Sequence, residues 1–152
     1  MTGQENTATM AALASCREDR RQAQGQGNIS VPSFQWPLVG EITSYYGWRN
    51  GTYHYGLDIA APIGTIIKAA APGYVIQTGL RNGYGLALTI DHGKGWGTLY
   101  AHNSANLVRE GDRVIAGQPI AKVGASGNAT GPHLHLEIIL DGNKLDPLSF
   151  LP

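Results

Sequence analysis

Two histidines near the C-terminal end of the chain, His133 and His135, are two residues apart in an apolar run that predicts a β-strand. Alternate residues of a strand share one face of a sheet, so both imidazoles would point the same way. Paired imidazoles on a rigid element suit a metal site. Alternate histidines on a solvent-facing strand would give the same pattern. The glycine-rich segment 127–132 would fix the start of the strand, and this favours the functional interpretation.

A second segment offers another imidazole and a carboxylate, because His54 and Asp58 stand on either side of Gly56. Taken alone, they could be a surface histidine and a turn residue. Together with His133 and His135, they would supply metal ligands from two separate segments. A metal site requires such a combination, which favours the functional interpretation. Imidazoles and one carboxylate, with no cysteine nearby, are typical of a catalytic zinc that keeps one coordination position open for water.

The remaining histidines have different surroundings. His102 follows an apolar run and precedes polar residues, which predicts a strand end at a cleft. Its side chain could act as a general acid or base, because an unperturbed imidazole titrates near neutrality. A hydrogen-bonded residue at a strand end would look the same. His92 precedes a glycine turn and has no partner motif, so we interpret it as structural or exposed.

Composition limits the fold and the partners. The 152 residues are 42% hydrophobic and 14% charged, which fits one domain with a core. Eleven basic residues balance eleven acidic ones, so charge gives no argument for nucleic acid or an anionic membrane as a partner. The lone Cys16 excludes an intramolecular disulfide and a cysteine-based zinc cluster.

Turn residues separate short apolar runs along most of the chain. The 21 glycines and 8 prolines recur between runs rich in Val, Ile, Thr and Tyr, which predicts an all-β fold. Successive hairpins of this kind would form an antiparallel sheet, either a sandwich or a partly open barrel. The expected strands are residues 42–47, 65–68, 73–80, 86–92, 97–102, 113–115, 120–123 and 133–140.

The N-terminal part differs in composition. Residues 1–33 are polar and low in large apolar side chains, which predicts a flexible leader with at most a helical turn near residues 10–21. Residues 34–152 would form the folded domain. No apolar stretch is long enough to span a bilayer. The segment from Leu13 to Cys16 weakly resembles a lipoprotein cleavage box.

Three motifs in this order resemble the lysostaphin-type zinc metallopeptidases of family M23, also called LytM domains. They are His54-x-Gly-x-Asp58, then Tyr100-Ala101-His102, then the segment 127–137 that contains His133-Leu134-His135. The resemblance implies the LytM, or duplicated hybrid motif, fold and one zinc ion per chain. It implies that His54, Asp58 and His135 bind the zinc. His102 and His133 would then stand beside the metal-bound water and assist catalysis.

The same resemblance implies a function. The protein would be a zinc-dependent endopeptidase that hydrolyses peptide cross-links of bacterial peptidoglycan, with peptide stems or bridges as its substrates. It would work outside the cytoplasm, in the periplasm, the cell wall or the medium. Some relatives have lost ligands and only activate other hydrolases, so a non-catalytic wall-binding module is the alternative. This chain keeps all five positions, which favours an enzyme.

Two other β-rich classes fit less well. Residues 110–120 resemble the strand and turn pattern of biotinyl and lipoyl carrier domains, but neither Lys68 nor Lys122 has the setting of a modified lysine. A sugar-transport phosphocarrier would use paired histidines, but Asp58 beside the histidine pair favours a metal.

Further residues have expected roles around the site. A His-Glu-x-x-His helix is absent from the sequence, so a histidine is the available base, and Glu137 would support the site structurally rather than act in catalysis. Four aromatic residues are expected to line the substrate groove: Tyr46, Trp48, Tyr53 and Tyr55.

Overall fold

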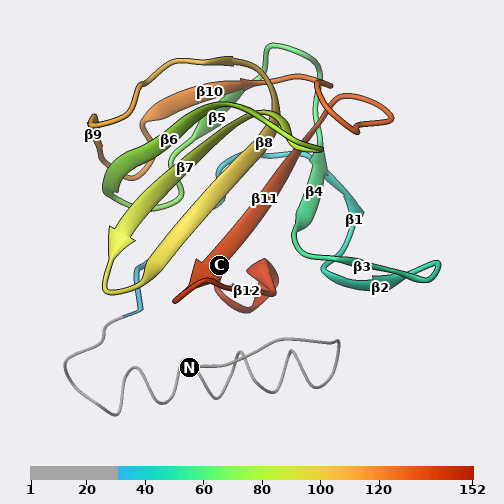
Figure 1. Cartoon of the computed structure of the whole chain (residues 1–152), viewed down its shortest axis with the longest axis horizontal. Coiled ribbons are helices and arrows are strands. Elements are labelled where there is room, and N and C mark those ends of the chain that lie inside the picture. The colour runs from blue at the N-terminus through green and yellow to red at the C-terminus, as the bar shows by residue number, and fades with distance from the viewer. Residues whose placement is uncertain (1–30) are drawn as a thin grey trace.

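The computed structural model describes residues 31–152, which form strands and one short 3-10 helix, η1 (Pro147–Ser149) (Figure 1). The strands are β1 (Glu41–Ser44), β2 (Gly47–Arg49), β3 (Thr52–His54), β4 (Leu57–Ala60), β5 (Ile66–Lys68), β6 (Gly73–Arg81), β7 (Gly85–Gly93), β8 (Trp96–Asn106), β9 (Arg113–Val114), β10 (Pro119–Val123), β11 (His133–Leu140) and β12 (Asn143–Leu145). The all-β class expected from the sequence is confirmed.

Within this part of the chain, one antiparallel sheet of ten strands makes up most of the fold. Its main order is β1-β4-β11-β8-β7-β6-β9, with β12 beside β11 and β10 between β5 and β8. The ends of this order do not pair with each other, so the sheet is open. Strands β6, β7 and β8 follow one another as hairpins, but β11 lies between β4 and β8 although it is distant from both in sequence.

Strand β8 bends at His102 and joins two parts of the sheet. Residues before the bend pair with β7 and β11, whereas Asn103, Ala105 and Asn106 pair with β10, and Asn103 also lies opposite Leu86 of β7. The backbone of His102 has a φ of 65°, in the left-handed region that non-glycine residues seldom adopt. The prediction that this strand ends at His102 is therefore wrong, because the bend lets the chain continue to Asn106.

One face of β11 belongs to the core and the other faces the candidate site. Leu134, Leu136 and Ile138 are fully buried in the core. His133 and His135 alternate with them and point to the opposite face. The strand bounds predicted from the sequence, 133–140, agree with β11.

The segment before β4 differs from the expectation. The strand predicted for residues 42–47 ends at Ser44, and the chain then forms the separate β2–β3 hairpin where a loop was expected. Asn50 and Gly51 form its turn, with φ values of 48° and 81°. Asn-Gly is the preferred pair for a two-residue hairpin turn with two positive φ angles, so the local signal for this hairpin was present.

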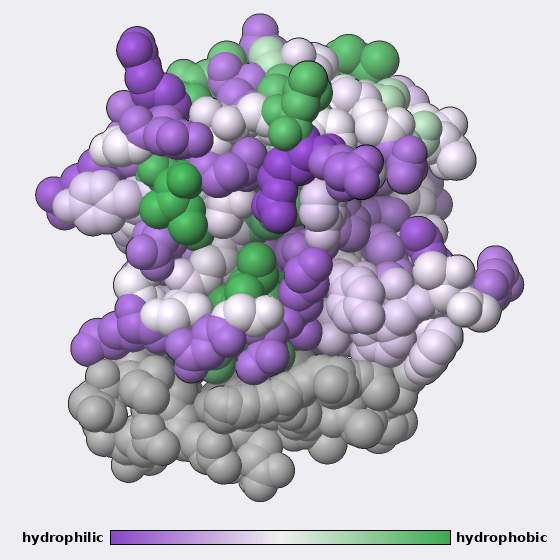
Figure 2. All heavy atoms as spheres, in the orientation of Figure 1, coloured by the Kyte–Doolittle hydropathy of each residue, from purple (hydrophilic) through white to green (hydrophobic). Residues whose placement is uncertain are grey.

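Residues 1–30 lie outside the described part of the chain, and with them the expected helical turn and the segment from Leu13 to Cys16. Val31 packs against the core cluster that contains Phe34 and Trp96. The boundary between leader and domain stays a prediction. Among the described residues, no helix has the length and apolar character needed to cross a membrane. On the face drawn in Figure 2, exposed apolar groups are scattered among polar ones.

His92 has a structural setting away from the other histidines. Its Nδ1–H donates to the carbonyl of Pro72 at 2.6 Å, and its Nε2 accepts from the Thr98 hydroxyl at 2.8 Å. The edge of its ring meets Phe34, with 5.7 Å between ring centroids. Burial lowers the pKa of His92. These contacts agree with the structural interpretation of this residue.

His92 should make the fold sensitive to acid. Because its pKa is lower in the folded protein, the unfolded chain takes up a proton first as the pH falls below about 6.5, and stability is lost there. We expect wild type to lose more unfolding free energy than His92→Gln between pH 7.5 and 5.5, as measured by urea denaturation. Equal losses in both proteins would contradict this role.

Candidate metal centre

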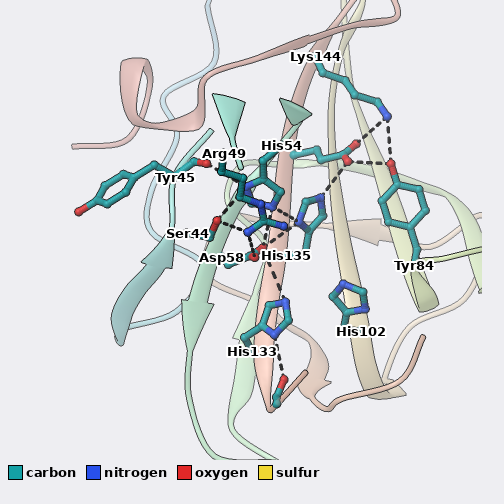
Figure 3. Close-up of polar contacts among 12 residues, drawn as sticks. Ser44, Tyr45, Arg49, His54, Asp58, Tyr84, His102, His133, His135 and Lys144 are labelled. Carbon is teal, nitrogen blue, oxygen red and sulfur yellow. Dashed lines mark hydrogen bonds and ion pairs between the residues drawn. The ribbon is translucent and has the colours of Figure 1, made fainter. Parts of the chain in front are cut away.

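Three polar side chains from three strands meet on the face of the sheet opposite the core. His54 ends β3, Asp58 lies on β4, and His135 lies directly opposite Asp58 on β11. Asp58 Oδ1 is 2.9 Å from His135 Nδ1 and 3.2 Å from His54 Nε2, and the two nitrogens are 3.2 Å apart (Figure 3). Ligands at tetrahedral zinc lie roughly 3.3 Å from one another. The three atoms therefore have nearly the spacing of a metal site.

The outer nitrogens of these two imidazoles are both bound to acceptors. His54 Nδ1–H donates to the carbonyl of Tyr45 at 2.9 Å, and His135 Nε2–H donates to Glu137 at 2.9 Å. In their neutral forms, both rings then turn a lone pair toward Asp58. Two lone pairs and a carboxylate facing one another need a cation between them, so the donor set fits a divalent metal.

The charges around His135 also favour a cation. Burial opposes the charged imidazole, but hydrogen bonds to Asp58 and Glu137 raise the pKa of His135 to about 9. Burial likewise opposes the ionised form of Asp58, but hydrogen bonds from His135 and His54 in their protonated forms hold the pKa of this carboxyl well below its usual range. The cluster therefore stabilises positive charge at the position where the three ligand atoms meet.

Gly56 lets the two motif segments approach each other. A Cβ atom at this position would lie 2.6 Å from both His135 Cε1 and the carbonyl oxygen of Leu136. Any side chain would push β11 away from the segment that carries His54 and Asp58. The glycine between these two residues is thus required by the packing of the site.

His102 and His133 lie beside this group. Their ring centroids are 4.9 Å apart, and the His102 centroid is 5.9 Å from that of His135. His133 Nε2 is 3.7 Å from Asp58 Oδ1. Both rings donate Nδ1–H to loop carbonyls, His102 to Ser126 at 2.7 Å and His133 to Gly131 at 2.9 Å. Both are therefore left with Nε2 for a ligand.

The bend in β8 determines where His102 points. Regular alternation along the strand would place residue 102 on the same face as Tyr100, which is buried in the core. The positive φ at residue 102 instead brings its ring next to His133 and His135. A strained backbone that presents a side chain to a site is a common feature of functional positions.

An open cleft of about 750 Å³ surrounds the four histidines. Residues of the β2–β3 hairpin, the β6–β7 turn and the loop before β11 line it. The lining residues are Arg49, Asn50, Thr52, His54, Asp58, Asn82, Gly83, Tyr84, His102, Asn128, Thr130, His133 and His135. A cleft of this size, lined by hydrogen-bonding groups, can hold an extended peptide.

The four aromatic residues expected in the groove, Tyr46, Trp48, Tyr53 and Tyr55, are not among the residues that line the described cleft. They pack on one another beside it, with Tyr53 within 5.0 to 5.4 Å of the other three rings. The reason is strand alternation in β3: Thr52 and His54 face the cleft, so Tyr53 faces the other way. The expectation that these four residues contact a substrate stays a prediction.

Glu137 lies behind His135 and is almost fully buried. Its Oε2 accepts from His135 Nε2–H and from the Tyr84 hydroxyl at 2.8 Å. Lys144 Nζ lies 3.5 Å from Oε1 of the same carboxylate and donates to the Tyr84 oxygen at 3.0 Å. This agrees with the supporting role expected for Glu137. Tyr84 and Lys144 were not found from the sequence, because no short motif joins them to the histidines.

We expect Glu137→Gln to weaken binding of a divalent metal ion such as zinc by about 10- to 100-fold, the usual cost of losing a group that orients a metal ligand. The amide can still accept from His135, but it lacks the negative charge that favours the Nδ1 lone pair facing Asp58. Competition with a chromophoric chelator measures the affinity. Glu41→Gln, at an exposed position on β1, is the matched control. Equal affinity in the Glu137 variant and wild type would contradict this role.

The residues at this site indicate a class of protein. Two imidazoles and one carboxylate fit a metal with an open position, and two more imidazoles border that position. These are the features of a metal-binding site that leaves room for a further ligand. The model of peptidase family M23 matches residues 52–147, and the chain belongs to this family.

Known relatives include both enzymes and activators. The DD-carboxypeptidase/endopeptidase Mpg of Neisseria meningitidis serogroup B is 40% identical over 139 residues, which cover 87% of this chain and 31% of that protein. The murein hydrolase activator EnvC of Escherichia coli is 40% identical over 129 residues, which cover 82% of this chain and 31% of that protein. The chain thus spans about a third of the length of these relatives.

Solved structures show the same fold. A zinc-containing peptidase from Vibrio cholerae superposes with a TM-score of 0.73 at 32% sequence identity, over 84% of this chain and 43% of that one. The resemblance stated from the three motifs is confirmed, and the fold is that of M23 peptidases.

Proposed function

We propose that this protein is a zinc-dependent endopeptidase that hydrolyses peptide cross-links of bacterial peptidoglycan outside the cytoplasm. One observation carries the proposal: the ligand atoms of His54, Asp58 and His135 meet within 3.2 Å of one another, with His102 and His133 beside them. Loss of one ligand would leave a binding module, and this chain has lost none.

His54 Nε2, Asp58 Oδ1 and His135 Nδ1 would hold the zinc, one ion per chain. The bound metal would supply a Lewis acid that polarises the peptide carbonyl and lowers the pKa of a water molecule toward 7. Tyr45 and Glu137 keep the two imidazoles in the tautomers that binding requires. The protein thus contributes preformed ligand geometry.

His102 and His133 would handle the proton of the reaction. Burial lowers the pKa of His102, so its ring is neutral near pH 7, with Nε2 free to accept a proton from the attacking water. The water oxygen bonds to the carbonyl carbon, the carbon–nitrogen bond breaks, and the proton passes through the imidazoles to the leaving nitrogen. A ring that has taken up the proton can also donate Nε2–H to the carbonyl oxygen as negative charge develops there.

Peptidoglycan digestion tests this proposal. The zinc-loaded protein should release soluble fragments from purified peptidoglycan, a chelator should stop the release, and added zinc should restore it. No release by protein that contains one zinc per chain would overturn the proposal.

The second candidate is a non-catalytic activator of another wall hydrolase. The relationship to EnvC, which carries the name of an activator, favours it. Such a protein would release nothing alone and would increase release by an added wall hydrolase that needs no metal, with or without chelator. The dependence on zinc therefore separates the two functions.

A further inference from the structure

Arg49 places a positive charge at the wall of the cleft. It lies on β2, and its guanidinium Nη1 contacts the Ser44 hydroxyl and lies 3.8 Å from Asp58 Oδ2 (Figure 3). About half of the side chain is exposed, on the side that lines the cleft. The guanidinium is thus close to the candidate metal ligands and open to a bound substrate.

The charges that line the cleft favour an anion. Among the described residues that line it, Arg49 carries the positive charge and Asp58 the negative one, while the others are histidines or uncharged. A divalent metal on the three ligands would leave the cleft positive overall, because the ion is the largest local charge. A cleft with excess charge of one sign concentrates ligands of the opposite sign.

The guanidinium has donors left for such a ligand. Both contacts described above use Nη1, so Nη2 and Nε are available. A planar guanidinium presents these donors as a fork that matches the two oxygens of a carboxylate. The other polar residues on the walls, such as Asn82, Asn128 and Thr130, are uncharged and therefore do not attract a carboxylate in the same way.

We propose that Arg49 determines specificity by binding a free carboxylate of the substrate next to the scissile bond. The inference rests on the proposed function. Because Nη1 lies 3.8 Å from a carboxylate oxygen of Asp58, its ligand belongs to a residue that flanks the scissile amide. The substrate class is a cross-link in which such a residue bears a free carboxylate. A bridge of glycines alone offers only backbone amides at that place.

Two cross-linked peptidoglycan fragments test the inference. They are identical except that the carboxylate beside the scissile bond is free in one and converted to a carboxamide in the other. Zinc-loaded wild type should cleave the free acid about 10- to 100-fold better in kcat/KM, the range expected for a charge-assisted hydrogen bond. The difference should appear mainly in KM.

Three variants of the full chain complete the test. Arg49→Gln should cleave the acid no better than the amide. Arg49→Lys should keep part of the preference, because it keeps charge without the fork. Arg113→Gln, an exposed position on β9, should behave like wild type. Thermal melting and zinc affinity of Arg49→Gln should both match wild type.

The outcomes separate this inference from the proposed function. Equal cleavage of both fragments by wild type, or an unchanged preference in Arg49→Gln, would overturn the role of Arg49 and leave the peptidase proposal standing. Weakened zinc binding in Arg49→Gln would also overturn it, since Arg49 would then serve to hold Asp58. Failure of zinc-loaded wild type to cleave either fragment would overturn the proposed function and this inference with it.

Discussion

His135→Ala is expected to lose zinc binding and peptidoglycan hydrolysis together. The imidazole supplies Nδ1 as one of three proposed ligand atoms, and the two ligands that remain, His54 and Asp58, are fewer than the three that a catalytic zinc site uses. The folded state of wild type should gain about 2.7 kcal/mol of stability when free zinc is 100 times its Kd, and the variant should gain none.

Metal analysis after zinc reconstitution and thermal melting with and without zinc measure these effects. Alanine also leaves Asp58 and Glu137 without the imidazole between them, which can weaken the fold itself. His135→Gln keeps much of the volume and a hydrogen-bonding group, so it tests the ligand with less disturbance. His133→Ala is the control, because it removes an imidazole two residues away and should still bind one zinc. A His135 variant that keeps stoichiometric zinc would contradict the ligand assignment.

The second large effect is expected at His102, where zinc should stay and turnover should fall by about 10²- to 10⁴-fold, the usual loss for a general acid or base. His102 lines the cleft and its Nδ1 is bound to Ser126, but the ring is not one of the three proposed ligands His54, Asp58 and His135. His133→Ala should behave in the same way. Zinc content and initial rates of peptidoglycan hydrolysis are the two measurements.

The choice of substitution matters at residue 102. Its φ of 65° is poorly tolerated by alanine but is often adopted by asparagine. His102→Asn therefore keeps the bend in β8 and removes the imidazole, and it should match His102→Ala in turnover if proton transfer is what is lost. A His102→Asn protein with most of its hydrolytic activity, or without zinc, would contradict this division of roles.

Much of the candidate site could be predicted because it depends on local patterns. His133 and His135 alternate with apolar residues, so strand periodicity alone placed them on one face of β11. His54, Gly56 and Asp58 form a compact motif, and the contact that Gly56 allows with His135 explains the glycine. The resemblance to family M23 then joined segments that are far apart in the sequence, and the family is confirmed.

What was missed depends on contacts between distant segments or on backbone geometry. Apolar alternation cannot reveal the bend at His102, which turns the ring to the opposite face of β8. The hydrogen bond of Glu137 with Tyr84 and its ion pair with Lys144 join β11 to the β6–β7 connection and β12, and no short motif encodes them.

The side of β3 on which Tyr53 lies could have been predicted from the sequence. Once the Asn50-Gly51 pair predicts a hairpin, alternation in β3 places Tyr53 on the face opposite His54, away from the cleft. The error came from treating this segment as a loop. The loop interpretation also hid the position of Arg49, because the β2–β3 hairpin places this residue at the wall of the cleft.

Mass spectrometry of the fragments released from purified peptidoglycan by the zinc-loaded protein tests the central claim most directly. Hydrolysis of a cross-link adds one water across a peptide bond, so cross-linked dimers should disappear and uncross-linked monomers with intact sugar–peptide bonds should accumulate. Zinc-loaded His102→Asn should produce these monomers far more slowly. The account would be contradicted if wild type with one zinc per chain left the dimers intact, or if the released products were cleaved only between sugar and peptide.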